Sequence, residues 1–151
     1  MNHVTRFSAR TQRAAAAAAP ISQFVNSALA RRAEDPSASN FLFGNPQEMP
    51  LAGFTSALQR WAEPKHKDWF AYTTHLRPAQ EAVAASLHGR YGVSFAADDV
   101  LMTTGAFGGL SMLLAALLEE GDEVVYFSPP WFFYEAMILA AGGTPVRIRN
   151  T

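Results

Sequence analysis

The stretch EVVYFSPPWFFYEAMILAAGGTPVRIR, residues 123–149, decides the fold class of this chain. It opens with a continuous apolar run that two prolines stop, and this pattern predicts a strand with both faces covered. The segment FFYEAMILAAGG then predicts a helix that ends at Gly142 and Gly143, and TPVRIR predicts another strand. Strands that alternate with helices of about 10–15 residues are typical of a parallel α/β sheet.

The sequence just upstream extends the same alternation. DDVLMTTG, which begins at residue 98, predicts a short strand around 100–103 that runs into a glycine turn. FGGLSMLLAALLEEG predicts a buried helix that ends at Gly121. Three strands and two helices are fewer than a doubly wound sheet normally contains, so we expect the chain to be the opening of a larger protein.

The N-terminal part of the chain predicts helices and turns instead of strands. Its Ala-rich start, closed by Pro20, carries three arginines and no acid, and it predicts a loosely ordered arm in preference to a targeting presequence. Apolar residues at helical spacing predict helices downstream of this arm, and Gly92 offers a left-handed stop for the last of them. These predicted helices span residues 21–34, 54–62 and 78–92.

Composition and charge exclude several classes of protein. Twelve Lys and Arg against thirteen Asp and Glu give a net charge of −1, which excludes the basic field of a nucleic-acid binder. The absence of cysteine excludes disulfides and thiolate metal sites and fits a reducing, cytoplasmic compartment, and the four scattered histidines predict no metal site. The longest apolar run, at 110–118, is far shorter than the roughly 20 residues that a membrane span needs.

Residues 103–110, TTGAFGGL, form the first candidate site because they join a predicted strand to a predicted helix. Ligands bind at the carboxyl ends of strands in α/β folds, and the free N–H groups of a helix start can hold a phosphate. The motif is neither GxGxxG nor a P-loop, and Ser128 stands where a dinucleotide-binding domain would carry an acid after its second strand. A tight turn without a ligand explains this motif equally well when it is taken alone.

The second candidate site is the aromatic run at 131–134, which follows the next predicted strand. Aromatic rings at a strand end offer a face on which a planar ligand can stack, although such rings also fill ordinary cores. Two further segments, FLFGNP at 41–46 and WFAYTTHL at 69–76, predict by themselves only a turn and a packed strand or loop.

Taken together, in their order and spacing, these motifs resemble the N-terminal portion of a class I/II aminotransferase, from about residue 21 to 151. That resemblance implies the fold type I architecture and pyridoxal 5′-phosphate as cofactor. It places the cofactor phosphate at the backbone of Gly105, Ala106 and Phe107, and it makes Trp131 the aromatic residue that stacks on the cofactor ring. Tyr134 would lie at the edge of the pocket.

The resemblance also implies substrate- and cofactor-binding residues in the N-terminal part of the chain, and a second copy of the chain as partner. Gly44 and Asn45 would fall in the loop that faces the substrate carboxylate, and Tyr72 would reach the cofactor phosphate of the neighbouring subunit in a homodimer. Amino acids and 2-oxo acids would be the substrates. The implied organisation is a flexible arm over 1–20, part of the small domain and the domain connection over 21–97, and the start of the cofactor-binding large domain over 98–151.

The chain departs from the family pattern in two respects. The glycine that usually follows the tyrosine is absent after Tyr72, where the sequence is THLRPAQEAV. The catalytic lysine of the family lies further along than this chain extends, and Lys65 and Lys67, its only lysines, lie in a hydrophilic EPKHKD loop that does not match that site. We therefore expect an N-terminal portion of an aminotransferase that is inactive alone. A carbon–sulfur lyase of the same fold or a non-catalytic truncated product are the alternatives.

Overall fold

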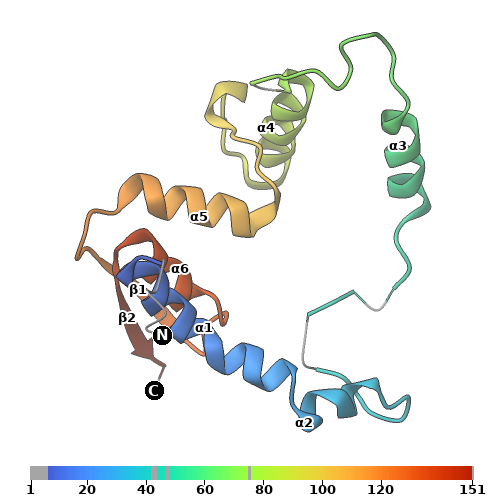
Figure 1. Ribbon diagram of the computed structural model, residues 1–151. Coiled ribbons are helices and arrows are strands. Elements are labelled where there is room, and N and C mark those ends of the chain that lie inside the picture. Colours follow the sequence, from blue (N-terminus) through green and yellow to red (C-terminus); the bar gives the residue numbers. More distant parts are fainter. Residues whose placement is uncertain (1–6, 42–43, 47, 75, 151) are drawn as a thin grey trace. The chain divides into compact units, whose positions relative to one another are not determined.

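The computed structural model describes residues 7–41, 44–46, 48–74 and 76–150 (Figure 1). The chain divides into two compact units, one formed by residues 1–42 together with 103–151 and the other by residues 43–102. No helix among the described residues has both the length and the apolar composition that crossing a bilayer requires.

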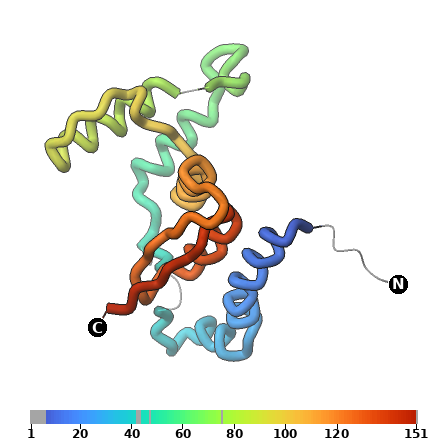
Figure 2. The backbone as a smooth tube through the Cα atoms, turned by 90° about the vertical axis from the view of Figure 1, so that its left-hand side faces the viewer, coloured from blue at the N-terminus to red at the C-terminus, as the bar shows by residue number. Residues whose placement is uncertain are grey.

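The first unit contains a two-stranded parallel sheet, which confirms the last two of the three strands that the sequence predicts. Strand β1 (Glu123–Ser128) pairs with β2 (Thr144–Arg149), with Glu123 opposite Thr144 and Phe127 opposite Ile148, and the strands lie side by side (Figure 1 and Figure 2). Helix α6 (Tyr134–Ala141) connects the two strands and ends at Gly142, whose φ of 96° is the left-handed conformation that glycine adopts without steric cost. This strand–helix–strand connection makes the chain an α/β protein.

Helix α6 covers one face of the sheet and leaves the other open. Helix α6 contacts β2, and Tyr126 of β1 and Met137 and Ile138 of α6 are buried, with Ile138 only 2% exposed. Side chains of successive strand residues point to opposite faces, so Val125 and Phe127 lie on the other face, where they are 55% and 64% exposed. The prediction that both faces of this strand are covered is therefore wrong for the described residues, because no second helix layer packs there.

The strand predicted around residues 100–103 is absent. A strand is stabilised by hydrogen bonds to a neighbouring strand, and no described segment pairs with these residues. A short 3-10 helix, η2 (Ala97–Asp99), precedes them, and helix α5 (Gly105–Leu117) follows them. Helix α5 also ends before Gly121, because the backbone already becomes extended at Leu118.

The predicted N-terminal arm is wrong for the described residues, which form helix α1 (Ala9–Val25). Alanine has the highest helix propensity of all residues, and the Ser8 hydroxyl accepts a hydrogen bond from the Thr11 amide to cap the first turn. The helix continues through Pro20 and packs against α6, so the predicted start at 21 and the single helix over 21–34 are also wrong. Helix α2 (Ala28–Arg31) and the 3-10 helix η1 (Arg32–Glu34) follow it.

Replacing Pro20 with alanine is expected to stabilise α1. Proline inside a helix removes a backbone hydrogen bond and costs about 3 kcal/mol relative to alanine, so we expect a gain of about 1–3 kcal/mol in the free energy of unfolding. Helical signal in far-ultraviolet circular dichroism during denaturant unfolding measures it. Pro78→Ala is the matched control, because Pro78 lies in the first turn of a helix, where proline is well tolerated. Equal effects of both substitutions would contradict the argument.

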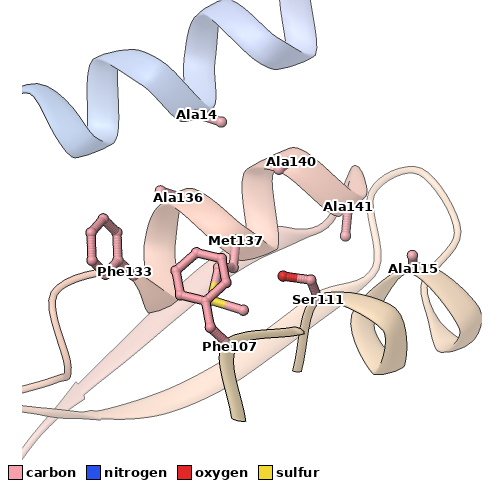
Figure 3. A pocket seen from close by; sticks show the side chains of 9 residues that line it. All are labelled: Ala14, Phe107, Ser111, Ala115, Phe133, Ala136, Met137, Ala140 and Ala141. Atoms are coloured by element: carbon pink, nitrogen blue, oxygen red, sulfur yellow. The ribbon is translucent and has the colours of Figure 1, made fainter. Parts of the chain in front are cut away.

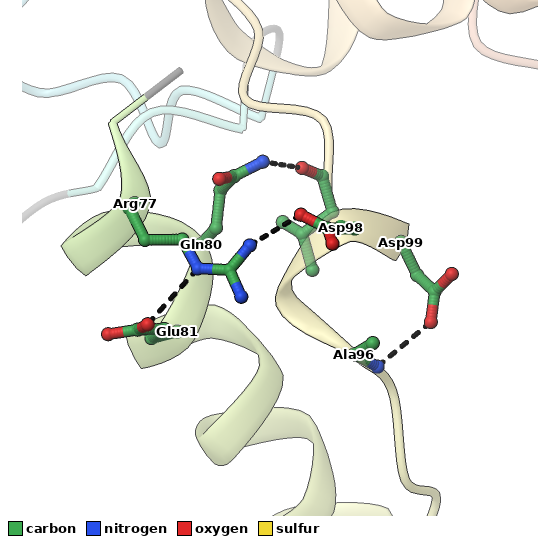
Figure 4. A network of polar contacts seen from close by, with 7 residues as sticks. Arg77, Gln80, Glu81, Ala96, Asp98 and Asp99 are labelled. Atoms are coloured by element: carbon green, nitrogen blue, oxygen red, sulfur yellow. Dashed lines mark hydrogen bonds and ion pairs between the residues drawn. The ribbon is translucent and has the colours of Figure 1, made fainter.

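The second unit confirms the two helices that the sequence predicts there, α3 (Ala52–Ala62) and α4 (Arg77–Tyr91). Gly92 ends α4 with a φ of 69°, as expected of a left-handed stop. Polar contacts attach η2 to α4 (Figure 4): Arg77 bonds both Glu81 and Asp98, and the buried Gln80 amide donates to the Val100 carbonyl at 2.7 Å. These contacts fix the segment that leads out of the unit toward α5.

Candidate functional site

The start of α5 offers unsatisfied hydrogen-bond donors. The first N–H groups of any helix have no carbonyl partner within the helix, and the side chain of Thr104, which precedes the helix, accepts no hydrogen bond from them. The Gly105 amide turns back to the Thr103 carbonyl at 2.8 Å, which leaves the amides of Ala106 and Phe107 at the open end. Backbone donors together with the positive end of the helix dipole favour an anion at this position.

The tight turn at this helix start depends on glycine. Gly105 has a φ of 75°, a conformation that side-chain-bearing residues rarely adopt, and no atom stands within 4 Å of where a Cβ would be. One turn later, a Cβ on Gly108 would lie 3.0 Å from the Thr104 hydroxyl, and one on Gly109 would lie 3.1 Å from the Thr103 hydroxyl. The two threonine hydroxyls therefore pack against the first turn of α5. Both threonines lie in the predicted candidate segment 103–110, but sequence reasoning assigned them no individual role.

An aromatic cluster adjoins this helix start, and Trp131 is at its centre. The indole ring lies 5.6 Å from the Phe107 ring, 5.3 Å from that of Phe133 and 5.5 Å from that of Tyr134, in edge-to-face arrangements. The rings of Phe107 and Trp131 are in contact, so the glycine turn and the aromatic run lie close together. Their position on one edge of a common sheet stays a prediction, because no strand precedes the glycine turn among the described residues. Trp131 remains 37% exposed, so part of its ring is open to a ligand.

A polar network of Tyr126, Glu135 and Arg147 lies next to the aromatic cluster. The Glu135 carboxylate lies 3.2 Å from the Arg147 guanidinium, and that guanidinium stands 5.7 Å from the centre of the buried Tyr126 ring. A hydrogen bond to the Tyr126 hydroxyl, together with the nearby Glu135 charge, raises the pKa of Arg147. The network joins the first turn of α6 to both strands, and it thereby fixes the position of Tyr134 at the helix start.

Behind the aromatic rings lies an apolar cavity of about 420 Å³ between α1, α5 and α6 (Figure 3). Phe107 and Phe133 form one wall of it, and Met137 and several alanines form most of the rest. Ser111 contributes the one side-chain hydroxyl among its lining residues. A charged phosphate has no suitable partners there, so the open start of α5 is the better place for an anion.

The remaining predicted site residues belong to the unit formed by residues 43–102. Gly44, Asn45 and Tyr72 are exposed in that unit, and their roles stay predictions. Leu42 and Phe43 of the predicted FLFGNP turn lie outside the described residues. Among the described residues, no three His, Asp or Glu side chains gather closely enough to hold a metal ion.

Comparison with known proteins identifies the family. Residues 37–151 match the family model for aminotransferase class I and II, and because this match covers most of the chain, the chain belongs to that family. No curated protein matches the sequence.

Solved structures of aminotransferases share the fold. A putative aminotransferase from Silicibacter pomeroyi aligns over 82% of this chain and 31% of its own, at 26% identity and a TM-score of 0.65. Aspartate aminotransferase from Thermotoga maritima aligns over 96% of this chain and 38% of its own, at 25% identity and a TM-score of 0.69. Alanine aminotransferase from Pyrococcus furiosus aligns over 97% of this chain and 37% of its own, with a TM-score of 0.74. Its identity to this chain is 22%, so it shows likeness of fold alone. The chain thus spans about a third of the length of these relatives and corresponds to part of the fold type I architecture.

Proposed function

We propose that this chain is the part of a pyridoxal 5′-phosphate-dependent aminotransferase that holds the phosphate and one ring face of the cofactor. The contact between Phe107 and Trp131 carries the proposal, because it sets an open helix start beside a partly exposed indole ring. A phosphate joined to a planar aromatic ring fits the chemistry of that pair. Family membership supports the same assignment.

Each residue at the start of α5 and in the aromatic cluster has a distinct role in the proposal. The amides of Ala106 and Phe107 would donate to phosphate oxygens, and Gly105 would let the backbone approach them closely. Trp131 would stack on the pyridine ring, and Tyr134 would close the edge of the pocket. When bound, the cofactor supplies an electron-withdrawing ring that accepts electrons from the α-carbon of the amino acid, while the protein supplies binding and orientation.

Family membership supports a proposal for the substrates and the assembly. We propose that the enzyme moves an amino group between an amino acid and a 2-oxo acid in the cytoplasm. Gly44 and Asn45 would face the substrate carboxylate, and Tyr72 would reach the cofactor phosphate of the neighbouring subunit in a homodimer. Lys65 and Lys67 lie on the surface, paired with Glu63 and Asp68, and neither would serve as the lysine that anchors the cofactor.

Binding of 4′-deoxypyridoxine 5′-phosphate tests the phosphate site directly. This analogue lacks the aldehyde and cannot react with lysine, so its affinity reports on the non-covalent site alone. We expect Gly105→Ala to weaken binding about tenfold or more, since the strained turn displaces amides whose bonds to a charged group contribute about 1.5–3 kcal/mol each. Isothermal titration calorimetry of both proteins measures the change.

Gly121→Ala is the matched control for this substitution. Gly121 also has a positive φ, 94°, and open space around an added Cβ, but it lies in the turn beyond the far end of α5. It therefore carries a comparable backbone strain without touching the proposed site. Equal loss of affinity in both variants, or equal affinity of the wild-type chain for the analogue with and without its phosphate, would refute the proposed site.

A further inference from the structure

The unit formed by residues 43–102 contains an aromatic cavity that shares only Tyr72 with the proposed cofactor and substrate sites. Its volume is about 630 Å³, which lies within the range of roughly 300–1,000 Å³ that is common for small-molecule sites. It opens where the end of α3, the following loop and the start of α4 meet. Trp61, Trp69 and Tyr72 supply its aromatic surface, and His66 and Asp68 supply polar groups.

Local contacts hold the walls of this cavity in place. The rings of Trp61 and Trp69 stack at 5.4 Å with 18° between their planes, and the Trp69 indole N–H donates to the Trp61 carbonyl at 3.0 Å. The His66 ring meets Trp69 edge-on at 5.3 Å. Backbone hydrogen bonds from Trp69 to His66 and from Ala71 to Asp68 close two turns in the loop. The aromatic wall is thus formed before any ligand binds.

The surface of the cavity is aromatic and carries one carboxylate. Trp61 is 58% exposed, and Tyr72 is fully exposed. Asp68 is the one acidic residue among the lining residues, and both of its oxygens contact the Lys67 ammonium, at 2.8 and 2.9 Å. Both partners of that ion pair are largely exposed, and pairs of this kind hold only weakly in water. A cation in the cavity can therefore compete for the Asp68 carboxylate.

We propose that this cavity binds a small organic cation whose charge lies on an alkylated ammonium group. The faces of indole and phenol rings attract cations, and tryptophan does so most strongly. An alkylated ammonium presents methyl groups to the mostly apolar walls, whereas a primary ammonium is strongly hydrated and loses more on entering them. The inference does not rest on the proposed aminotransferase function, because it is argued from contacts within the 43–102 unit, and Tyr72 is the one lining residue that also has a role in that proposal.

Choline and its neutral isostere 3,3-dimethyl-1-butanol are the probes that test this proposal. They have the same shape and differ in charge, so the difference between them isolates the attraction of the cation to the rings and to Asp68. We expect choline to bind the full chain about tenfold more tightly than the isostere. Tryptophan fluorescence in a Trp131→Phe background reports on it, because the two remaining tryptophans both line the cavity.

Two surface substitutions are expected to change the affinity for choline in opposite directions. Asp68→Asn removes the carboxylate and is expected to weaken choline binding, whereas Lys67→Ala frees that carboxylate and is expected to strengthen it. A gain of affinity cannot arise from misfolding, so the second variant keeps the proposal falsifiable. Trp61→Leu is expected to abolish binding, and Tyr91→Leu, an exposed aromatic residue of α4 outside the cavity, serves as its control.

Equal affinity for choline and the isostere would overturn the proposal, since the cavity would then recognise shape and apolar surface alone. Absence of choline binding would overturn it as well. Weaker binding in Lys67→Ala would also contradict the role of Asp68, because it would mean that the lysine and not the carboxylate contacts the probe. Tighter binding in Lys67→Ala together with loss in Trp61→Leu would support the site.

Discussion

The 151-residue chain, incubated with pyridoxal 5′-phosphate, an amino acid and a 2-oxo acid, is expected to show no transaminase turnover above that of free cofactor in buffer. The chemistry requires a lysine made nucleophilic by its surroundings, such as an apolar pocket or a neighbouring positive charge. Lys65 and Lys67 are the only lysines here, and both are surface side chains beside acids. Enzymes typically exceed their uncatalysed reactions by about a million-fold or more, so the difference from a complete aminotransferase is the largest effect we predict.

Formation of the product 2-oxo acid, followed by nuclear magnetic resonance, measures this turnover. The double variant Lys65→Arg, Lys67→Arg is the control, and it is expected to match the wild-type chain. Turnover in the wild-type chain that disappears in the double variant would show that one of these lysines is catalytic. Binding of the unreactive phosphate analogue is expected in the same preparation, so inactivity can be distinguished from loss of the phosphate site.

Local sequence patterns predicted the fold of residues 123–149 well. Helix α6 and the strands on either side of it were recognised because an apolar run, two prolines and a pair of glycines mark their ends, and all three elements obey purely local rules. Their parallel pairing also followed, because a helix that connects two strands of one sheet leaves them parallel. Patterns of this kind suffice where an element and its partner lie close together in the sequence.

Tertiary context explains the elements that sequence patterns missed. The strand expected around 100–103 has suitable residues, but a strand also needs a partner, and no pattern within these residues indicates which segment supplies one. Proline disfavours helix interiors, so the sequence predicts that the N-terminal arm ends at Pro20. The helix propensity of the alanine run and the packing of α1 on α6 outweigh the free-energy cost of this proline. In both cases long-range contacts, which a local pattern does not contain, decide the outcome.

The candidate site was predictable only in part, because some of its contacts also depend on tertiary structure. Segments 103–110 and 131–134 are candidates because they follow predicted strands, and the resemblance to aminotransferases selects Gly105, Phe107 and Trp131 within them. The structure brings Phe107 and Trp131 into contact. Thr103, Thr104 and Phe133 lie within the two predicted candidate segments, but no individual contact was predicted for them, because these contacts depend on how the turn folds back on α5 and on which rings meet. Gly44, Asn45 and Tyr72 belong to the other unit, and their part in the site remains a proposal.

Replacing Ile138 with alanine is expected to destabilise the unit that contains the sheet by about 2–5 kcal/mol, the usual cost of emptying a buried isoleucine site. Ile138 is the most deeply buried apolar side chain among the described residues, at 2% exposure. A Cβ added at Gly143 would stand 3.1 Å from the Ile138 side chain, so the helix packs closely on the start of β2. Domains are stable by only about 5–15 kcal/mol, so this loss is a large fraction of the total.

Amide hydrogen exchange measures which unit loses stability in Ile138→Ala. Amides of β1 and β2 are expected to lose protection in Ile138→Ala, whereas amides of α4, in the 43–102 unit, are expected to keep theirs, because local stability follows local packing. Leu117→Ala is the control: this side chain of α5 is 68% exposed, and substitutions at such positions usually change stability by less than about 0.5 kcal/mol. If both substitutions cost the same, or if α4 loses protection together with the strands, then Ile138 is not the centre of a separate core.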